Sequence, residues 1–149
     1  MSVKFEVLSH TDLFIGLSKE QALNLAACGK EELYHQDEII MQRGERGESL
    51  CIVLTGQIKV EPEAGYDLVI LGAGQGFGEM SLLDAGPRSA TIRCATPEAE
   101  LLCIPGPAIL AFCEEHCCAG YQIMYNLARD LTFKLRHRNL DSRSTNQEN

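Results

Sequence analysis

The sequence has no tryptophan, few other aromatic residues and no long hydrophobic run. Aromatic side chains make up 6% of the 149 residues, and no stretch approaches the roughly 18 apolar residues of a membrane-spanning helix. The first residues, MSVKFEVLSHTD, also lack the apolar core of a signal peptide. These absences predict a cytoplasmic protein that has no membrane partner.

Basic residues are scarce as well. The chain contains 13 Lys and Arg against 21 Asp and Glu, which gives a formal net charge of −8. Five of the 13 basic residues follow residue 128, so the rest of the chain is more acidic still. An acidic surface repels phosphate backbones and anionic lipids, and we therefore expect no DNA partner.

The seven cysteines lack the paired spacing of a zinc site or a disulfide framework. Only Cys113 to Cys118, in the order Cys-Glu-Glu-His-Cys-Cys, groups metal-binding residue types, and no second cluster completes a tetrahedral shell. The four histidines are scattered, which also argues against the metal site of barrel dioxygenases. We expect no metal and no cofactor.

What the chain does contain is glycine in its middle third. Nine of the 13 glycines lie between Gly44 and Gly86, where they separate short β-rich runs. With two later runs, the predicted strands cover residues 50–54, 57–60, 67–71, 89–95 and 100–104. Short strands between regular turns indicate an all-β sandwich or barrel.

Helical patterns flank this β zone on both sides. Ser18 and Gln21 form a capping box for a short helix that ends at Gly29. After Pro105 the hydrophobic period becomes 3.6, which predicts one helix around Ile109 and Phe112 and a long one over residues 121–139. The long helix carries an apolar stripe of Ile123, Met124, Leu127, Ala128, Leu131 and Leu135. The predicted fold is mainly β with flanking helices, a β-barrel with one N-terminal and two C-terminal helices. Residues 140–149 form a polar tail that we expect to be disordered.

The residues that carry chemistry lie between Gly72 and Thr91. Alternating glycines let the backbone approach a ligand closely, and residues 79–83 fit a single helical turn whose free N–H groups point at an anion. Arg88 adds a fork of donors that suits phosphate oxygens. Glu79 would repel a phosphate but would accept a hydrogen bond from a sugar hydroxyl.

This segment resembles the phosphate-binding cassette of the cyclic nucleotide-binding domain family. The matching motifs are Phe77-Gly78-Glu79 and Pro87-Arg88-Ser89-Ala90-Thr91, at the spacing the family uses. Further similarity runs through Leu13-Phe14, Arg43-Gly44-Glu45, Gly47 and Ile52 to Gly56, so that it covers about residues 10–139. The resemblance implies a jelly-roll β-barrel as the fold of this domain.

The resemblance also implies a role for each residue of the cassette. Glu79 would accept the ribose 2′-hydroxyl and Arg88 would pair with the cyclic phosphate. The implied cradle comprises Gly78, Glu79, Met80, Ser81, Arg88, Ser89 and Ala90. Because Arg-Ser-Ala resembles the bacterial catabolite activators, the implied ligand is cAMP, with cGMP as the other option. The alternative interpretation is an internal Glu79–Arg88 ion pair in a domain that binds nothing.

The family closes its site with a lid from the last helix. In the catabolite activators this lid offers two adjacent hydroxyl residues to adenine, and the aligned positions here are Lys134 and Leu135. This departure leaves Thr132, Lys134 and Arg136 as candidates for contacting the base.

The sequence therefore predicts a cyclic nucleotide sensor that repositions its C-terminal helix. No nucleophile with an adjacent base lies in the cassette, so we expect no enzyme activity. The helix stripe predicts a homodimer, and a sensor of this size needs an unidentified downstream protein. The ten residues after Asn139 do not hold a helix-turn-helix. The competing hypothesis is a ligand-free scaffold or dimerisation module with the same fold.

Overall fold

The computed structural model describes residues 2–61, 68–83, 86–88 and 90–147. Three helices precede the first strand: α1 (Ser2–Ser9), the 3-10 turn η1 (Asp12–Phe14) and α2 (Lys19–Ala26). The strands are β1 (Lys30–His35), β2 (Ile39–Met41), β3 (Ser49–Thr55), β4 (Ile58–Glu61), β5 (Val69–Leu71), β6 (Gly76–Phe77), β7 (Thr91–Cys94) and β8 (Glu98–Pro105). The 3-10 turn η2 (Glu79–Leu82) separates β6 from β7, and α3 (Gly106–Glu115) and α4 (Cys117–Gln147) follow β8.

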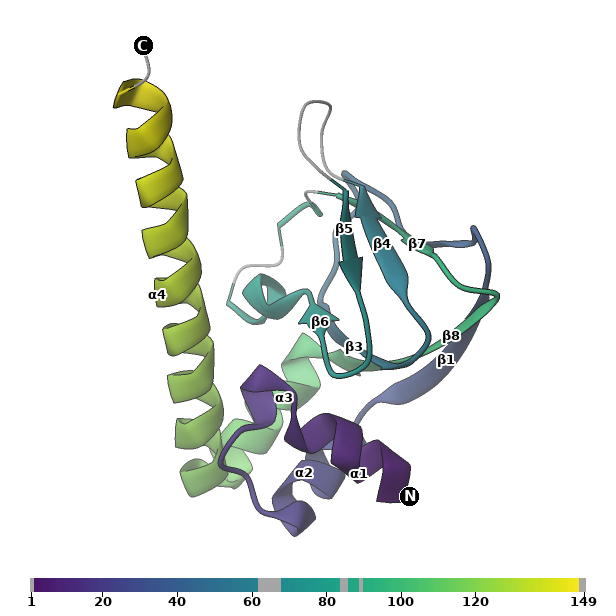
Figure 1. Cartoon of the computed structure of the whole chain (residues 1–149). Coiled ribbons are helices and arrows are strands. Elements are labelled where there is room, and N and C mark those ends of the chain that lie inside the picture. Colours follow the sequence, from purple (N-terminus) through teal and green to yellow (C-terminus); the bar gives the residue numbers. More distant parts are fainter. Residues whose placement is uncertain (1, 62–67, 84–85, 89, 148–149) are drawn as a thin grey trace.

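The strands of the described residues form two four-stranded antiparallel sheets. One sheet has the order β1-β8-β3-β6 and the other the order β2-β7-β4-β5. The sheets wrap into a roll, α1, α2 and α3 lie at one end of it, and α4 runs from that end along its side (Figure 1). This arrangement confirms the predicted jelly-roll class with flanking helices.

Strand β3 separates two hydrophobic cores because its side chains alternate between the faces of the sheet. Leu50, Ile52 and Leu54 pack with the helices, whereas Cys51 and Val53 belong to the core inside the roll. Both faces of β3 are therefore buried.

Two of the predicted helices begin and end much as expected. The Ser18 hydroxyl accepts a hydrogen bond from the Gln21 backbone N–H at 3.1 Å, and the Gln21 side chain accepts one from the Ser18 backbone N–H at 2.9 Å. This confirms the capping box of α2. Helix α3 contains Ile109 and Phe112, and both side chains are buried.

The structure extends or corrects the sequence prediction at several elements. Helix α1 was not predicted, although its Leu8 is fully buried. Strands β1, β2 and β6 were not predicted either. Helix α4 begins at Cys117 and continues to Gln147, so most of the predicted disordered tail is helical. No Gly or Pro after Gly120 interrupts this helix.

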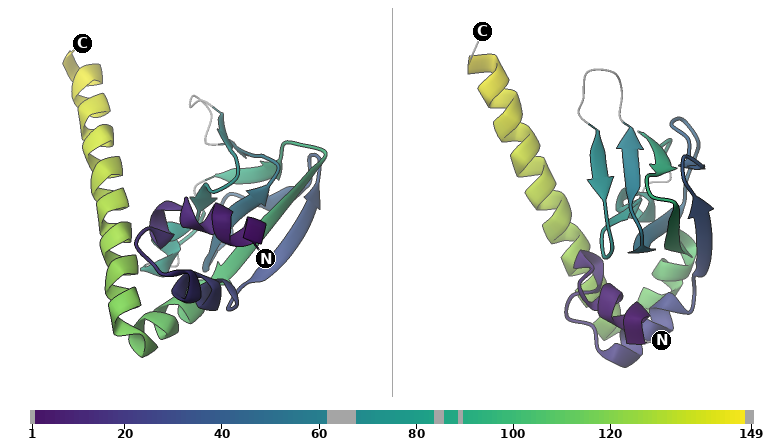
Figure 2. Two further views of the ribbon diagram at one scale, coloured as in Figure 1. Left: turned by 60° about the horizontal axis from the view of Figure 1, so that its bottom comes forward. Right: turned by 45° about the vertical axis from the view of Figure 1, so that its right-hand side comes forward.

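The apolar stripe of α4 divides into a buried and an exposed part. Ile123 and Leu127 are buried against the helix-side core, and Met124 and Leu131 are partly buried there. Ala128 and Leu135 are exposed, so the rest of the chain covers only part of the stripe. In both further views the C-terminal half of α4 stands clear of the roll (Figure 2).

Candidate functional site

Arg88 lies in the connection between η2 and β7, where backbone hydrogen bonds hold it against the β2–β3 connection. Its backbone N–H donates to the Glu45 carbonyl at 2.7 Å, and its carbonyl accepts from the Gly44 N–H at 2.9 Å. The guanidinium Nη2 donates to the Ser49 carbonyl at 2.9 Å. The side chain of Arg88 is thus anchored at the start of β3.

Two glycines make room for this guanidinium. A Cβ atom at Gly47 would collide with the guanidinium, and one at Gly78 would lie 2.8 Å from Nη1. Gly78 also has a φ of +92°, a backbone conformation that strains other residues. The Phe-Gly-Glu motif therefore has a packing reason for its glycine. A glycine is needed at position 47 for the same purpose, to leave room for the guanidinium, and sequence analysis did not identify this role.

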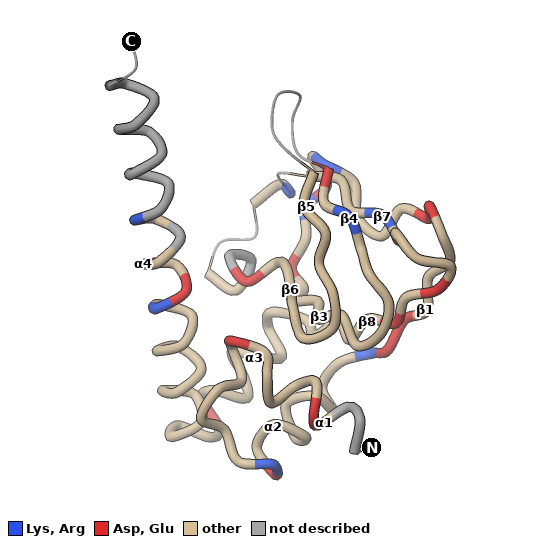
Figure 3. The backbone as a smooth tube through the Cα atoms, viewed as in Figure 1, with Lys and Arg blue, Asp and Glu red and all other residues tan. Residues whose placement is uncertain are grey.

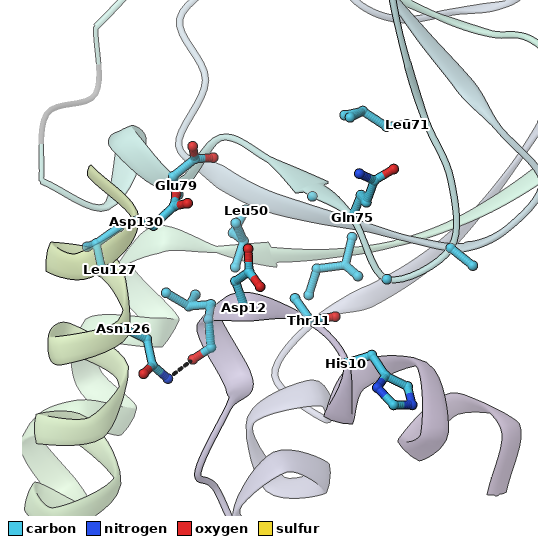
Figure 4. Close-up of a pocket in the computed structure, with 15 residues that line it drawn as sticks. His10, Thr11, Asp12, Leu50, Leu71, Gln75, Glu79, Asn126, Leu127 and Asp130 are labelled. Atoms are coloured by element: carbon cyan, nitrogen blue, oxygen red, sulfur yellow. Dashed lines mark hydrogen bonds between the residues drawn. The ribbon is translucent and has the colours of Figure 1, made fainter. Parts of the chain in front are cut away.

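Glu79 begins η2, where the sequence predicted a single helical turn. The half-buried Glu79 lines a cavity of about 390 Å³ between the roll and the helices (Figure 4). The walls come from the segment from His10 to η1, from β3, from the segment between β5 and η2, and from α4: His10, Thr11, Asp12, Leu13, Leu50, Ile52, Leu71, Ala73, Gly74, Gln75, Gly76, Glu79, Asn126, Leu127 and Asp130. Arg88 is not among these lining residues. The Arg88 guanidinium lies instead beside Gly78, the residue directly before Glu79.

The cavity is acidic and lined with polar groups. Asp12, Glu79 and Asp130 contribute three carboxylates from three different elements, and Gln75 and Asn126 add amides. The tube trace shows acidic positions on η1, η2 and α4 on the same side of the molecule (Figure 3). Such a lining suits hydroxyl and amine donors and disfavours a phosphate, which the Arg88 guanidinium suits better.

Helix α4 is fixed beside this cavity by a buried amide. The Asn126 side chain, 7% exposed, donates from Nδ2 to the carbonyls of Leu13 at 2.9 Å and Ile15 at 2.7 Å. Its Oδ1 accepts from Gln122 Nε2 at 3.0 Å. Sequence analysis missed this anchor, although an asparagine beside Ile123 and Leu127 in the stripe was a signal of a buried polar contact.

The predicted lid residues lie further along α4. The Thr132 hydroxyl donates to the Ala128 carbonyl at 2.7 Å, and both Thr132 and Arg136 are exposed. The cavity instead receives Asn126, Leu127 and Asp130 from this helix. Base contacts by Thr132, Lys134 and Arg136 stay predictions.

Several predicted cassette residues lie outside what the structure describes. Ser89 is one of these, as are the side chains of Met80 and Ser81 and that of the predicted lid residue Lys134. Ala90 is described and half-buried, directly before β7. The Thr91 hydroxyl that follows it accepts a hydrogen bond from the Arg43 backbone N–H at 3.1 Å.

Two properties of the described residues bear on other function classes. In this part of the chain, no helix has the length and apolarity needed to cross a membrane. The same residues hold no group of three or more His, Cys, Asp or Glu side chains placed to bind a metal ion.

Comparison with known proteins gives a consistent result. Residues 31–116 match the family model described as "Cyclic nucleotide-binding domain". The cyclic AMP receptor protein of Thermus thermophilus is 33% identical over 123 residues, which cover 80% of this chain and 56% of that protein. The human cyclic nucleotide-gated channel beta-3 is 34% identical over 88 residues, or 58% of this chain and 11% of the channel.

The solved structures agree with these matches. The crystal structure of the Thermus thermophilus catabolite activator protein superposes with a TM-score of 0.80 and 30% identity, and covers 91% of this chain and 63% of that one. The chain thus spans about half the length of the receptor and about a tenth of the channel.

Proposed function

Because the chain belongs to the cyclic nucleotide-binding domain family, we propose that it is a regulatory sensor that binds cAMP and responds through its C-terminal helix. The observation that carries this proposal is the position of the Arg88 guanidinium. A permanently charged fork packs over Gly47 and Gly78 beside η2, as a phosphate-binding residue would need.

In the proposed complex, different protein groups bind the phosphate and the ribose of the nucleotide. Arg88 pairs with the cyclic phosphate, and the backbone of Gly78, Met80, Ser89 and Ala90 completes the phosphate cradle. Glu79 accepts the ribose 2′-hydroxyl, and its place in the cavity lining agrees with a partner other than phosphate. The ligand is held without bond-making chemistry, so the proposed protein is a sensor and not an enzyme, and it needs no cofactor.

The preference for cAMP rests on resemblance and relatives. The Arg88-Ser89-Ala90 sequence is similar to that of the catabolite activators, and one of the relatives is a cyclic AMP receptor protein. The carboxylates of Asp12 and Asp130 offer acceptors to amino groups of either purine, so they do not separate cAMP from cGMP.

The proposed output is a change in the position and self-association of α4. Its exposed surface carries large apolar side chains: Tyr121 (71% exposed), Phe133 (63%), Leu135 (61%) and Tyr125 (48%). A second copy of α4 across a two-fold axis would cover them. Ligand that contacts α4 at Asn126 to Asp130 shifts the population of helix positions by its differential affinity for them. The resulting homodimer would signal to a downstream protein, without DNA or membrane contacts.

Titration calorimetry of nucleotide-free protein tests the ligand. We expect saturable heat with cAMP, weaker binding of cGMP and none of linear AMP. Absence of heat with both cyclic nucleotides would favour the alternative, a scaffold or dimerisation module that keeps the fold and binds nothing.

Sedimentation and limited proteolysis test the output. We expect cAMP to change both the association constant and the cleavage rate between Arg129 and Arg138. Leu33→Ser, which alters an exposed apolar side chain on β1, provides the control for nonspecific association. A monomer with ligand-independent cleavage would refute the helix response while leaving the binding site intact.

A further inference from the structure

Two cysteines face each other inside the roll. Cys51 on β3 lies directly opposite Cys103 on β8 in the antiparallel register. The Cys51 side chain is buried and Cys103 is half-buried, and both pack with the core inside the roll. Neither is bonded to another cysteine, since all seven cysteines of the chain are free.

The register places this pair at a position where the Cα atoms of the two strands are closest together. The Gly106 N–H donates to the Glu48 carbonyl, so residues 48 and 106 form a hydrogen-bonded pair. Hydrogen-bonded and non-hydrogen-bonded pairs alternate along antiparallel strands, which makes Cys51 and Cys103 a non-hydrogen-bonded pair. Pro105, opposite Ser49, agrees with this assignment because it has no N–H to donate.

This geometry is compatible with a disulfide. The Cα atoms of a non-hydrogen-bonded pair lie about 4.5 Å apart, inside the usual disulfide range of about 4.4–6.8 Å. A side-chain hydrogen bond with Cys103 and burial raise the pKa of the Cys51 thiol far above its ordinary value. The two residues already face each other across the ladder, so closing the bond requires no change of register.

We propose that Cys51 and Cys103 form a reversible cross-strand disulfide when the protein meets hydrogen peroxide, which makes the interior of the roll a redox modification site. The half-buried Cys103 reacts first. Its thiolate attacks one peroxide oxygen, the O–O bond breaks, and water leaves after protonation, so that Cys103 becomes a sulfenic acid. The Cys51 sulfur then displaces the hydroxyl group as a second water. Two thiols and one peroxide thus give one disulfide and two waters.

Cys94 provides an internal control within the same core. It is also fully buried, but its thiol faces the backbone carbonyls of Thr96 at 3.2 Å and Tyr34 at 3.7 Å, and its residue pairs with Ile58 on β4. Cys94 should therefore stay reduced under conditions that oxidise the Cys51–Cys103 pair.

The experiment uses the full chain with the four cysteines outside the roll replaced, as Cys28→Ser, Cys113→Ala, Cys117→Ser and Cys118→Ser. The protein is incubated with hydrogen peroxide, free thiols are alkylated, and the peptides are mapped by mass spectrometry. We expect a Cys51–Cys103 cross-linked peptide, an alkylated Cys94, and loss of the cross-link after treatment with dithiothreitol.

Thermal unfolding gives a second readout that needs no nucleotide. The disulfide would close a loop of about fifty residues, so the oxidised form should melt roughly 10 °C higher than the reduced form. Cys103→Ser in the same background should abolish this rise. The proposal is overturned if Cys51 and Cys103 both stay alkylatable, if Cys103 becomes a sulfinic acid while Cys51 alkylates, or if the cross-link forms without raising the melting temperature.

Discussion

Replacing Arg88 with Ala is the most informative test of the binding site. The substitution removes the counter-charge proposed for the cyclic phosphate, which should cost about 2–5 kcal/mol of binding free energy. This loss corresponds to a weakening of cAMP affinity by about 30-fold to several thousand-fold. Titration calorimetry measures it directly, and Arg88→Lys should recover part of the affinity because a lysine keeps the charge without the fork.

The same substitution also acts on stability, so binding and folding must be measured together. Arg88→Ala removes the charged hydrogen bond from Nη2 to the Ser49 carbonyl, worth about 1.5–3 kcal/mol. Arg93→Ala is the matched control, because Arg93 also donates to a backbone carbonyl, that of Asp37 at 3.3 Å, and pairs with Glu61 at 3.2 Å. We expect Arg93→Ala to lower stability and leave cAMP affinity within about twofold. If Arg88→Ala is folded by thermal denaturation and binds cAMP as tightly as the unaltered chain, the site assignment is wrong.

Four other substitutions test the remaining parts of the structure. Glu79→Gln should weaken cAMP binding less than Arg88→Ala does, because the amide oxygen can still accept a hydrogen bond from the ribose. If calorimetry shows that the unaltered chain binds 2′-deoxy-cAMP as tightly as cAMP, Glu79 does not accept the 2′-hydroxyl. Asn126→Ala should lower the free energy of unfolding by about 2–3 kcal/mol in urea titrations, since it leaves the carbonyls of the η1 region without their side-chain donor; an unchanged midpoint would contradict the anchor. Burial and the neighbouring carboxylate of Glu32 raise the pKa of Tyr34, so the unfolded chain loses this proton near pH 10 while the folded chain keeps it. Stability should therefore fall as pH rises above about 10, and Tyr34→Phe should flatten that slope in alkaline denaturation series. Phe133→Ser should shift sedimenting dimer toward monomer, and a variant that dimerises normally would exclude this face of α4 as the contact.

The elements that sequence reasoning found are those with a strong local pattern. The continuous apolar run of β3, the partly alternating β8, the capping box at Ser18 and the glycines around Gly78 all express their structure within a few residues. Strand β1 has five exposed residues out of six, so its sequence carries little hydrophobic alternation, and it is held mainly by pairing with β8. Such pairing joins residues about 70 positions apart, so no local sequence pattern predicts it.

The same limit applies to the site. The proposed role of Arg88 in a phosphate cassette rests on its neighbours in sequence, and the structure adds the reason for two glycines beside it, Gly47 and Gly78. The cavity beside Glu79 depends on where α4 lies relative to η1, which the Asn126 side chain fixes across more than 110 residues of sequence. Sequence reasoning did not predict that Asp130 lines this cavity, because a single charged residue on a helix usually faces solvent.

The hydrogen bonds of Asn126 hold α4 close to its N-terminal end and leave the rest of the helix to project. The helix is pinned to the η1 region at this residue and pressed against α3 where Gly120 meets Cys113, while its far end at Gln147 projects beyond the roll. At the usual rise per residue, Asp130 lies about 6 Å from the pivot and Gln147 about 31 Å from it. A rigid helix that turns about Asn126 therefore multiplies a displacement at Asp130 by about five at its end. In the proposed response, a ligand that displaced Asp130 would therefore move the C-terminal end of α4 furthest.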